Sequence, residues 1–201
     1  MAVDYGGLYT CISSFLENPA VKAANGDIFK LLDLLKEELS IQLHPYDDFQ
    51  DEFTKISNDG YTIYDGKNFH IFYNNMMGKR VRFTLGHELG HIVLGHFLIK
   101  DKHLSQEFLD DLEKEANIFS RNINIPAVKV ETYRVLFGDE ALRYFFERRG
   151  FSRKFISCSF AWASVDYKNI KYTDLDFSSE MIDKELQELN LIYLNMNSVA
   201  L

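Results

Sequence analysis

The sequence predicts a mainly helical α+β fold with one small β-sheet. Apolar residues recur at helical spacing in several long segments, whereas two short runs rich in β-forming residues flank a turn between 61 and 73. The chain has 201 residues, of which 46% are hydrophobic, so it can bury a full core and is not a disordered chain.

Most of the expected helices are marked by their apolar periodicity and by their ends. Asp27 and Ser105 are typical N-cap residues, and Pro19 and Pro126 follow the ends of two helical patterns. Helices are expected over 8–17, 27–40, 79–97, 104–124, 139–149 and 178–194.

The strands are predicted from β-forming residues and turn signals. Residues 61–64 and 69–73 flank a short turn, which predicts a β-hairpin in a small sheet beside the helix over 79–97. The segment 43–59 is polar and acidic, and we expect a loop there. Residues 155–177 are aromatic and β-branched, and we expect them to form one or two strands.

The helix expected over 79–97 carries the pentapeptide His87-Glu88-Leu89-Gly90-His91. Two histidines four residues apart lie on one face of a helix, which is the spacing needed to hold one zinc ion through two ring nitrogens. Glu88 follows the first histidine, where its carboxylate can reach a water molecule on the metal. The pentapeptide therefore predicts a catalytic zinc site on this helix.

A catalytic zinc ion needs a third protein ligand and an open position for water. The metzincin pattern fails here, because Leu94 and Phe97 stand where that pattern has Gly and His. His96 would point about 140° away from His91 on a continuous helix, so it is a poor ligand unless the helix breaks at Gly95. A glutamate from the next helix is the better candidate.

Two glutamates of that next helix, Glu113 and Glu115, flank its apolar stripe, so spacing does not choose between them. Asn117 lies four residues after Glu113 on the same face, where it could hydrogen-bond a metal ligand. This neighbour favours Glu113, and Glu115 stays the alternative. His96 and His103 are of ligand type as well, but we expect both at the surface.

Charge and composition exclude several classes of protein. The net charge of −8 argues against direct nucleic-acid binding, and the basic residues between 148 and 154 are expected to form a solvated face. Cys11 and Cys158 are far apart and are expected to be reduced thiols. The sequence has no membrane-length apolar run and begins without a secretory signal, which favours a cytoplasmic protein without membrane contacts.

Two segments resemble known motifs. The run from Phe83 to His96, which contains the pentapeptide, resembles the motif of the ImmA/IrrE family of zinc metallopeptidases. In order and spacing the resemblance covers about 27–150, and the chain departs from it at 122–126, where the family usually has a Leu-Leu-Met-Pro-like run. The second segment, which is similar to that family's Glu-x-Glu-Ala-Asn-x-Phe-Ala signature, is Glu113-Lys114-Glu115-Ala116-Asn117-Ile118-Phe119-Ser120.

The resemblance implies a fold and a substrate. A zincin-like metallopeptidase domain would cover 27–150, after an N-terminal segment over 1–26. The C-terminal extension over 151–201 lies beyond the resemblance, and we expect it to pack on the same domain. The substrate would lie extended along 69–73 and add an edge to the sheet. Family members on prophages and mobile elements cleave or inactivate a cognate transcriptional repressor, which implies a protein substrate of that kind.

The resemblance also implies the roles of the site residues. Zn²⁺ would be held by His87, His91 and Glu113, and Glu88 would be the catalytic base that takes a proton from the attacking water. A zinc site can also persist in a protein that only binds its partner. The alternative is therefore a non-catalytic regulatory module that sequesters a repressor or an antitoxin.

Overall fold

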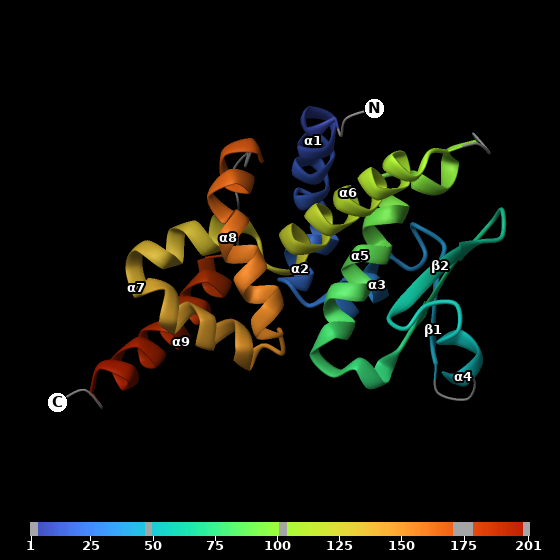
Figure 1. Cartoon of the computed structure of the whole chain (residues 1–201). Coiled ribbons are helices and arrows are strands. Elements are labelled where there is room, and N and C mark those ends of the chain that lie inside the picture. The colour runs from blue at the N-terminus through green and yellow to red at the C-terminus, as the bar shows by residue number, and fades with distance from the viewer. Residues whose placement is uncertain (1–3, 47–49, 101–103, 171–178, 199–201) are drawn as a thin grey trace. The chain divides into compact units, whose positions relative to one another are not determined.

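The computed structural model describes residues 4–46, 50–100, 104–170 and 179–198 (Figure 1). Most of these residues are helical and three strands form a small sheet, which confirms the predicted mainly helical α+β fold. The chain forms two compact units, Met1–Asn124 and Ile125–Leu201. The division at 26 and 150 that the sequence predicts stays a prediction. Among the described helices, none is both long and apolar enough to cross a membrane.

Three short helices begin the first unit, and each starts at a side-chain cap. Asp4, Asn18 and Asp27 each accept a hydrogen bond from a backbone N–H in the first turn of the helix that follows. The helix predicted over 27–40 is confirmed at its start but ends at Leu35. The three helices are α1 (Tyr5–Leu16), α2 (Pro19–Ala24) and α3 (Ile28–Leu35).

The sheet has the strand order β1-β3-β2. β2 and β3 form the predicted antiparallel hairpin, with Thr62 opposite Ile71. The side chain of Asp65 closes the turn, because it accepts hydrogen bonds from the N–H groups of Lys67 and Asn68. The strands are β1 (Ile41–Pro45), β2 (Gly60–Tyr64) and β3 (Phe69–Tyr73).

The loop predicted over 43–59 is wrong in two places. β1 pairs in parallel with β3, with Leu43 opposite Ile71, and Gln50–Phe53 forms the short helix α4. Two parallel strands are separated by a long connection in the sequence. The residues of 43–59 therefore carry no local signal that β1 forms and pairs with β3.

The helices predicted over 79–97 and 104–124 are confirmed as α5 (Val81–Val93) and α6 (Gln106–Asn124), and they pack against each other. Gly86 and Gly90 of α5 permit the close approach: a Cβ added to Gly90 would lie 3.2 Å from the Ala116 Cα of α6. α5 also packs against β2 and β3 (Figure 1), so one helix contacts both α6 and the sheet. Short 3₁₀ segments, η1 (Asn75–Arg80) and η2 (His96–Leu98), flank α5.

The described part of the second unit is helical. Glu185 is buried and accepts hydrogen bonds from Lys129 and Tyr133, each at 3.0 Å, and from Arg149 at 2.6 Å. This cluster joins α9 to α7. α7 is interrupted at Gly138, and the helix predicted over 139–149 corresponds to its second half. The helices are α7 (Ala127–Arg148), α8 (Arg153–Asn169) and α9 (Ser179–Ser198), the last of which confirms the helix predicted over 178–194.

The strands predicted over 155–177 are wrong, because α8 occupies most of this segment. Its buried residues Phe155, Ile156, Phe160 and Ala163 recur at helical spacing, and the Ser152 hydroxyl caps the helix. Burial of this stripe outweighs the β propensity of the individual residues. The end of the predicted strands, 171–177, lies outside the described residues.

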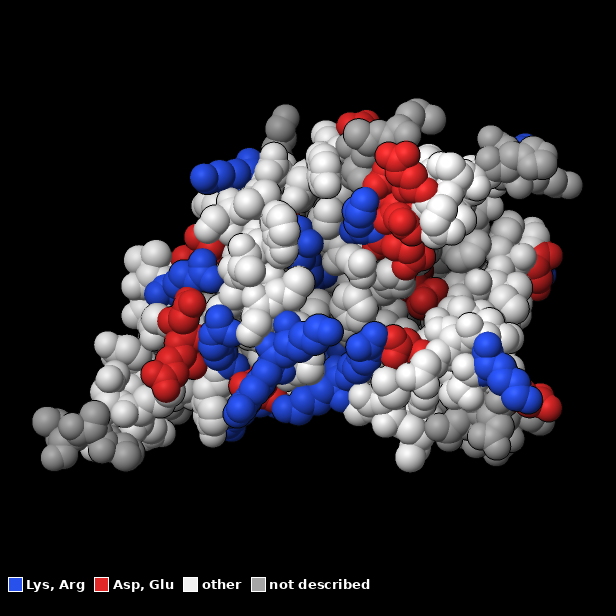
Figure 2. All heavy atoms as spheres, in the orientation of Figure 1, with Lys and Arg blue, Asp and Glu red and all other residues white. Residues whose placement is uncertain are grey.

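Lys and Arg side chains gather in the second unit where α7 ends and α8 begins (Figure 2). Arg148, Arg153 and Lys154 are exposed, whereas Arg149 is half-buried and bonded to Glu185. The three exposed side chains have the solvated character that the sequence predicts for this cluster.

Candidate metal centre

α5 presents His87 and His91 on one face, one turn apart. Their Nε2 atoms are 3.0 Å apart, the ring planes meet at 71°, and the ring centroids are 4.7 Å apart. The rings are therefore not stacked, and their Nε2 atoms converge on a common point beside the helix.

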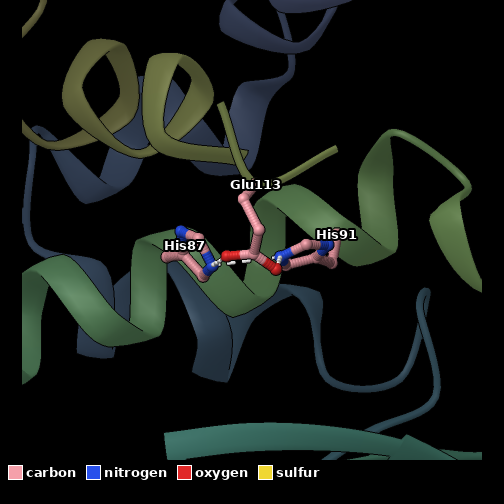
Figure 3. Close-up of side chains that lie close together, drawn as sticks. All are labelled: His87, His91 and Glu113. Atoms are coloured by element: carbon pink, nitrogen blue, oxygen red, sulfur yellow. Dashed lines mark hydrogen bonds and ion pairs between the residues drawn. The ribbon is translucent and has the colours of Figure 1, made fainter. Parts of the chain in front are cut away.

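Glu113 of α6 reaches between the two rings (Figure 3). Its Oε2 lies 3.1 Å from the Nε2 of His87, and its Oε1 lies 3.4 Å from the Nε2 of His91. The ligand atoms of these three residues all lie within 4.8 Å of one another. The structure thus brings together the three residues predicted as metal ligands.

This donor set fits a metal ion. Two imidazole nitrogens and one carboxylate oxygen are the ligands of one class of catalytic zinc site, which also keeps a position open for water. Hydrogen bonds from His87 and His91 hold the pKa of the Glu113 carboxyl well below its usual range, so this candidate ligand is ionised. Burial lowers the pKa of His87, but the hydrogen bond to Glu113 leaves that pKa above its usual value.

Asn117 supports the first histidine from α6. Its side-chain Oδ1 lies 3.0 Å from the Nδ1 of His87, the contact with a ligand that its position after Glu113 predicted. The amide oxygen can only accept, so the Nδ1–H of His87 donates this hydrogen bond, and Nε2 is the nitrogen left to bind a metal.

Glu88 lies beside the ligands and is 7% exposed. The hydroxyl of Thr62, on β2, donates a hydrogen bond of 2.8 Å to its Oε2. Burial raises the pKa of the Glu88 carboxyl, although His87 and Thr62 favour its charged form. A carboxylate with a raised pKa, fixed by a neighbour, has the properties of a general base.

His96 and Glu115 are arranged differently from the sequence expectation. The His96 side chain is 6% exposed, so the prediction that it lies at the surface is wrong. Its Nδ1 lies 2.8 Å from the Nδ1 of His91, and its Nε2 lies 3.1 Å from the Oε2 of Glu115. Glu115, the alternative third ligand, thus contacts His96 instead of the metal position. His103 lies outside the described residues.

Burial lowers the pKa of His96 to about 4, so this imidazole is neutral at pH 7. Burial also raises the pKa of the Glu115 carboxyl, with Asp111 as a second cause. 

A pocket of about 520 Å³ opens onto the ligands and Glu88. One side of it is formed by Gly60, Tyr61 and Thr62 of β2, and Phe83 and Phe97 also line it. Apolar and polar surfaces therefore meet beside the candidate metal position, as in many small-molecule and peptide sites.

His70 is not among the described residues that line this pocket. Its Nδ1 lies 3.1 Å from the Nε2 of His44, and its Nε2 lies 3.1 Å from the Oδ2 of Asp65. Its side chain is 22% exposed, so it is only partly solvent-facing.

The prediction that a substrate adds to the sheet along 69–73 is wrong. β3 lies between β1 and β2 and pairs with both, so its two edges are already occupied. β2 pairs with β3 alone among the described strands, and it is the strand that lines the pocket.

The sequence model of Peptidase M78, described as the IrrE N-terminal-like domain, matches residues 43–153, more than half of the chain. The chain belongs to this metallopeptidase family. Searches of curated proteins and of solved structures each returned no match. The region matched to the IrrE N-terminal-like domain contains β2, β3, α5 and α6, and with them every residue of the candidate metal centre.

The places of two residues in this IrrE-like centre, Thr62 and His96, were not predicted from the sequence. Threonine is common in strands, so its presence at position 62 does not indicate a functional role. Only the register of the sheet places its hydroxyl beside Glu88. The direction of the His96 side chain depends on how α5 ends, and the prediction that it lies at the surface holds only for a helix that continues past Gly95. Gly95, with φ 73° and ψ 22°, was the available signal, since glycine commonly ends helices in this left-handed conformation.

Proposed function

We propose that this IrrE-like peptidase is a zinc-dependent endopeptidase that cleaves a regulatory protein, with a transcriptional repressor as the substrate. The observation that carries the proposal is the convergence of His87, His91 and Glu113 beside a buried Glu88. A metal-retaining site has no need of a carboxylate at the position of Glu88, whereas hydrolysis needs a base there.

Zinc is the metal that the ligands favour. Imidazole nitrogens suit zinc, copper, iron and nickel, and two histidines with one glutamate form a recurring catalytic zinc set. When bound, zinc polarises the scissile carbonyl and stabilises the negative charge that develops on its oxygen. His87, His91 and Glu113 would hold it, with Asn117 keeping the His87 ring in place.

Glu88 would act as the base. Its Oε2 is held by the Thr62 hydroxyl, and its carboxylate would take a proton from the attacking water and then pass it to the leaving amine. Burial raises its pKa, which makes the carboxylate a better proton acceptor near neutral pH.

β2 would bind the substrate backbone. Its outer edge has no partner strand among the described residues, and Gly60 to Thr62 line the pocket. A peptide that pairs with this edge would run past the candidate metal position, with main-chain hydrogen bonds for affinity and side-chain contacts for specificity. The choice of a repressor as this peptide's source follows the family resemblance alone.

The experiment compares wild-type protein with Glu88→Gln and Glu107→Gln. Each is loaded with one equivalent of Zn²⁺ and incubated with native and denatured proteome-derived protein, and new N-termini are identified by mass spectrometry. Glu107 is an exposed carboxylate in the first turn of α6, so its variant controls for the loss of one charge.

Wild type and Glu107→Gln should generate the same new N-termini, and Glu88→Gln should generate at least about a hundredfold fewer while binding zinc equally. Equal yields from Glu88→Gln would contradict the role of Glu88. Zinc-loaded wild type that leaves every protein intact would favour the alternative, a non-catalytic module that sequesters a repressor or an antitoxin.

A further inference from the structure

We infer that His96 and Glu115 are positioning residues, which fix the ring of His91 for metal binding through a buried hydrogen-bonded relay. The relay runs from Glu115 through His96 to His91. The inference rests on the metal centre of the proposed function, and it does not depend on peptide cleavage.

The contact between the two imidazoles has the geometry of a hydrogen bond. The Nδ1 atoms of His91 and His96 are 2.8 Å apart, while the ring centroids are 4.9 Å apart. That centroid separation is close to the largest that two rings joined in this way can have, so both nitrogens lie near the line between the rings. The pair His87 and His91 differs: its nitrogens are farther apart, at 3.0 Å, but its centroids are nearer, at 4.7 Å.

Proton accounting gives the relay its direction. A histidine that binds a metal through Nε2 carries its proton on Nδ1, so His91 must donate and His96 must accept between them. The Nδ1 of His96 is then unprotonated, and its proton is on Nε2. The Nε2 of His96 lies 3.1 Å from the Oε2 of Glu115, so this N–H donates a hydrogen bond that the carboxylate accepts. Each group has one role, and no proton is missing or in excess.

Burial makes the relay effective. The His96 side chain is 6% exposed and that of Glu115 is 20% exposed, so water competes little for these bonds. Carboxylate–histidine–metal arrangements orient the ligand ring and raise its basicity. Here one neutral imidazole is inserted between the carboxylate and the ligand.

The end of α5 creates this geometry. On a continuous helix His96 would point about 140° away from His91. Gly95 adopts φ 73° and ψ 22°, and this left-handed residue ends the helix and returns the chain toward the face of the ligands. Both α5 and the glycine that ends it therefore help to place the histidines of the candidate metal centre.

The two ligand histidines are supported unequally. His87 donates to the neutral amide oxygen of Asn117, whereas His91 donates into a chain that ends in a carboxylate. Hydrogen bonds that involve charged groups are roughly twice as strong as neutral ones. Loss of the relay should therefore affect His91 alone and leave the contact between His87 and Asn117 intact.

The experiment measures Zn²⁺ affinity by competition with a chromogenic chelator. His96→Leu removes the relay, His96→Gln keeps an acceptor and a donor, and Glu115→Gln keeps the shape while it removes the charge. His44→Leu is the matched control, since His44 lies on β1 and contacts His70. Far-ultraviolet circular dichroism verifies that each variant is folded.

We expect His96→Leu to weaken zinc binding by about tenfold to hundredfold, and Glu115→Gln by a smaller factor. His96→Gln should recover most of the loss, and His44→Leu should bind like wild type. A folded His96→Leu with wild-type affinity would overturn the inference. If His96→Leu does not fold, unchanged affinity in Glu115→Gln would overturn it as well.

A second readout is the Nδ1 proton of His91 in ¹⁵N-labelled, zinc-loaded protein. The relay shields this proton, so its resonance should be observed in wild type and in His96→Gln, and should be lost by exchange with water in His96→Leu. Its absence from wild type would contradict the relay. A protein that shows all these effects and cleaves nothing would refute the peptidase proposal and leave this one standing.

Discussion

Replacing Gly90 by alanine tests whether the close approach of α5 and α6 builds the metal centre. A Cβ on Gly90 would lie 3.2 Å from the Cα and the carbonyl oxygen of Ala116 and from the Cδ1 of Phe119. These contacts are closer than ordinary van der Waals separation. Two of the three atoms belong to the backbone, so α6 has to move as a whole to relieve them, and Glu113 moves with it.

Two opposing terms decide the size of the effect. Overpacking costs about 1–3 kcal/mol, whereas alanine is about 1 kcal/mol more favourable than glycine inside a helix. The free energy of unfolding should therefore fall by about 1 kcal/mol. Gly6→Ala in α1 is the matched control, because its nearest contact would be the Asp4 Oδ1 at 3.4 Å. It should stabilise the protein by up to about 1 kcal/mol.

The assay is urea-induced unfolding of the metal-free protein, followed by circular dichroism, together with zinc affinity from chelator competition. The free energy of unfolding of Gly90→Ala should be about 2 kcal/mol lower than that of Gly6→Ala. Gly90→Ala should also bind zinc more weakly than Gly6→Ala. Equal stability of the two variants, with equal zinc affinity, would refute the role assigned to the approach of the helices.

Three further predictions concern other contacts. Thr62→Val removes the hydrogen bond to Glu88, and kcat should fall about tenfold with zinc affinity unchanged, which steady-state kinetics and chelator competition measure. Burial raises the folded-state pKa of Glu88, so its ionisation destabilises the metal-free protein as pH rises through that pKa. Metal-free Glu88→Gln should then unfold at a higher temperature than wild type at pH 8, with the gap closing toward pH 4; equal values at pH 8 would contradict this. Glu185→Gln leaves buried Lys129 without its carboxylate and should lower the free energy of urea unfolding by about 3 kcal/mol.

Elements with a complete local signal were predicted correctly from the sequence. The hairpin has its turn residues, and α6 has an apolar stripe, the Ser105 cap and a proline after its end. The pentapeptide fixes the relation of His87 to His91, because four residues on any α-helix return to the same face. The candidate third ligand lies on a second helix, and Asn117 was the only local reason to favour Glu113.

Elements that depend on distant partners were not predicted. β1 looks like a polar loop because its parallel partner, β3, lies on the far side of α4 and β2 in the sequence. The position of β3 in the middle of the sheet depends on that pairing, and so does the proposal that a substrate pairs with β2. In α8 the residue types favour strands, whereas the buried residues Phe155, Ile156 and Phe160 have helical spacing, and the fold follows the spacing.

The most direct test of the metal centre is anomalous diffraction at the zinc edge from crystals grown with one equivalent of Zn²⁺. One strong peak is expected within about 2.0–2.2 Å of the Nε2 atoms of His87 and His91 and of a carboxylate oxygen of Glu113. A peak coordinated by Glu115 in place of Glu113, or zinc bound only elsewhere on the chain, would contradict it.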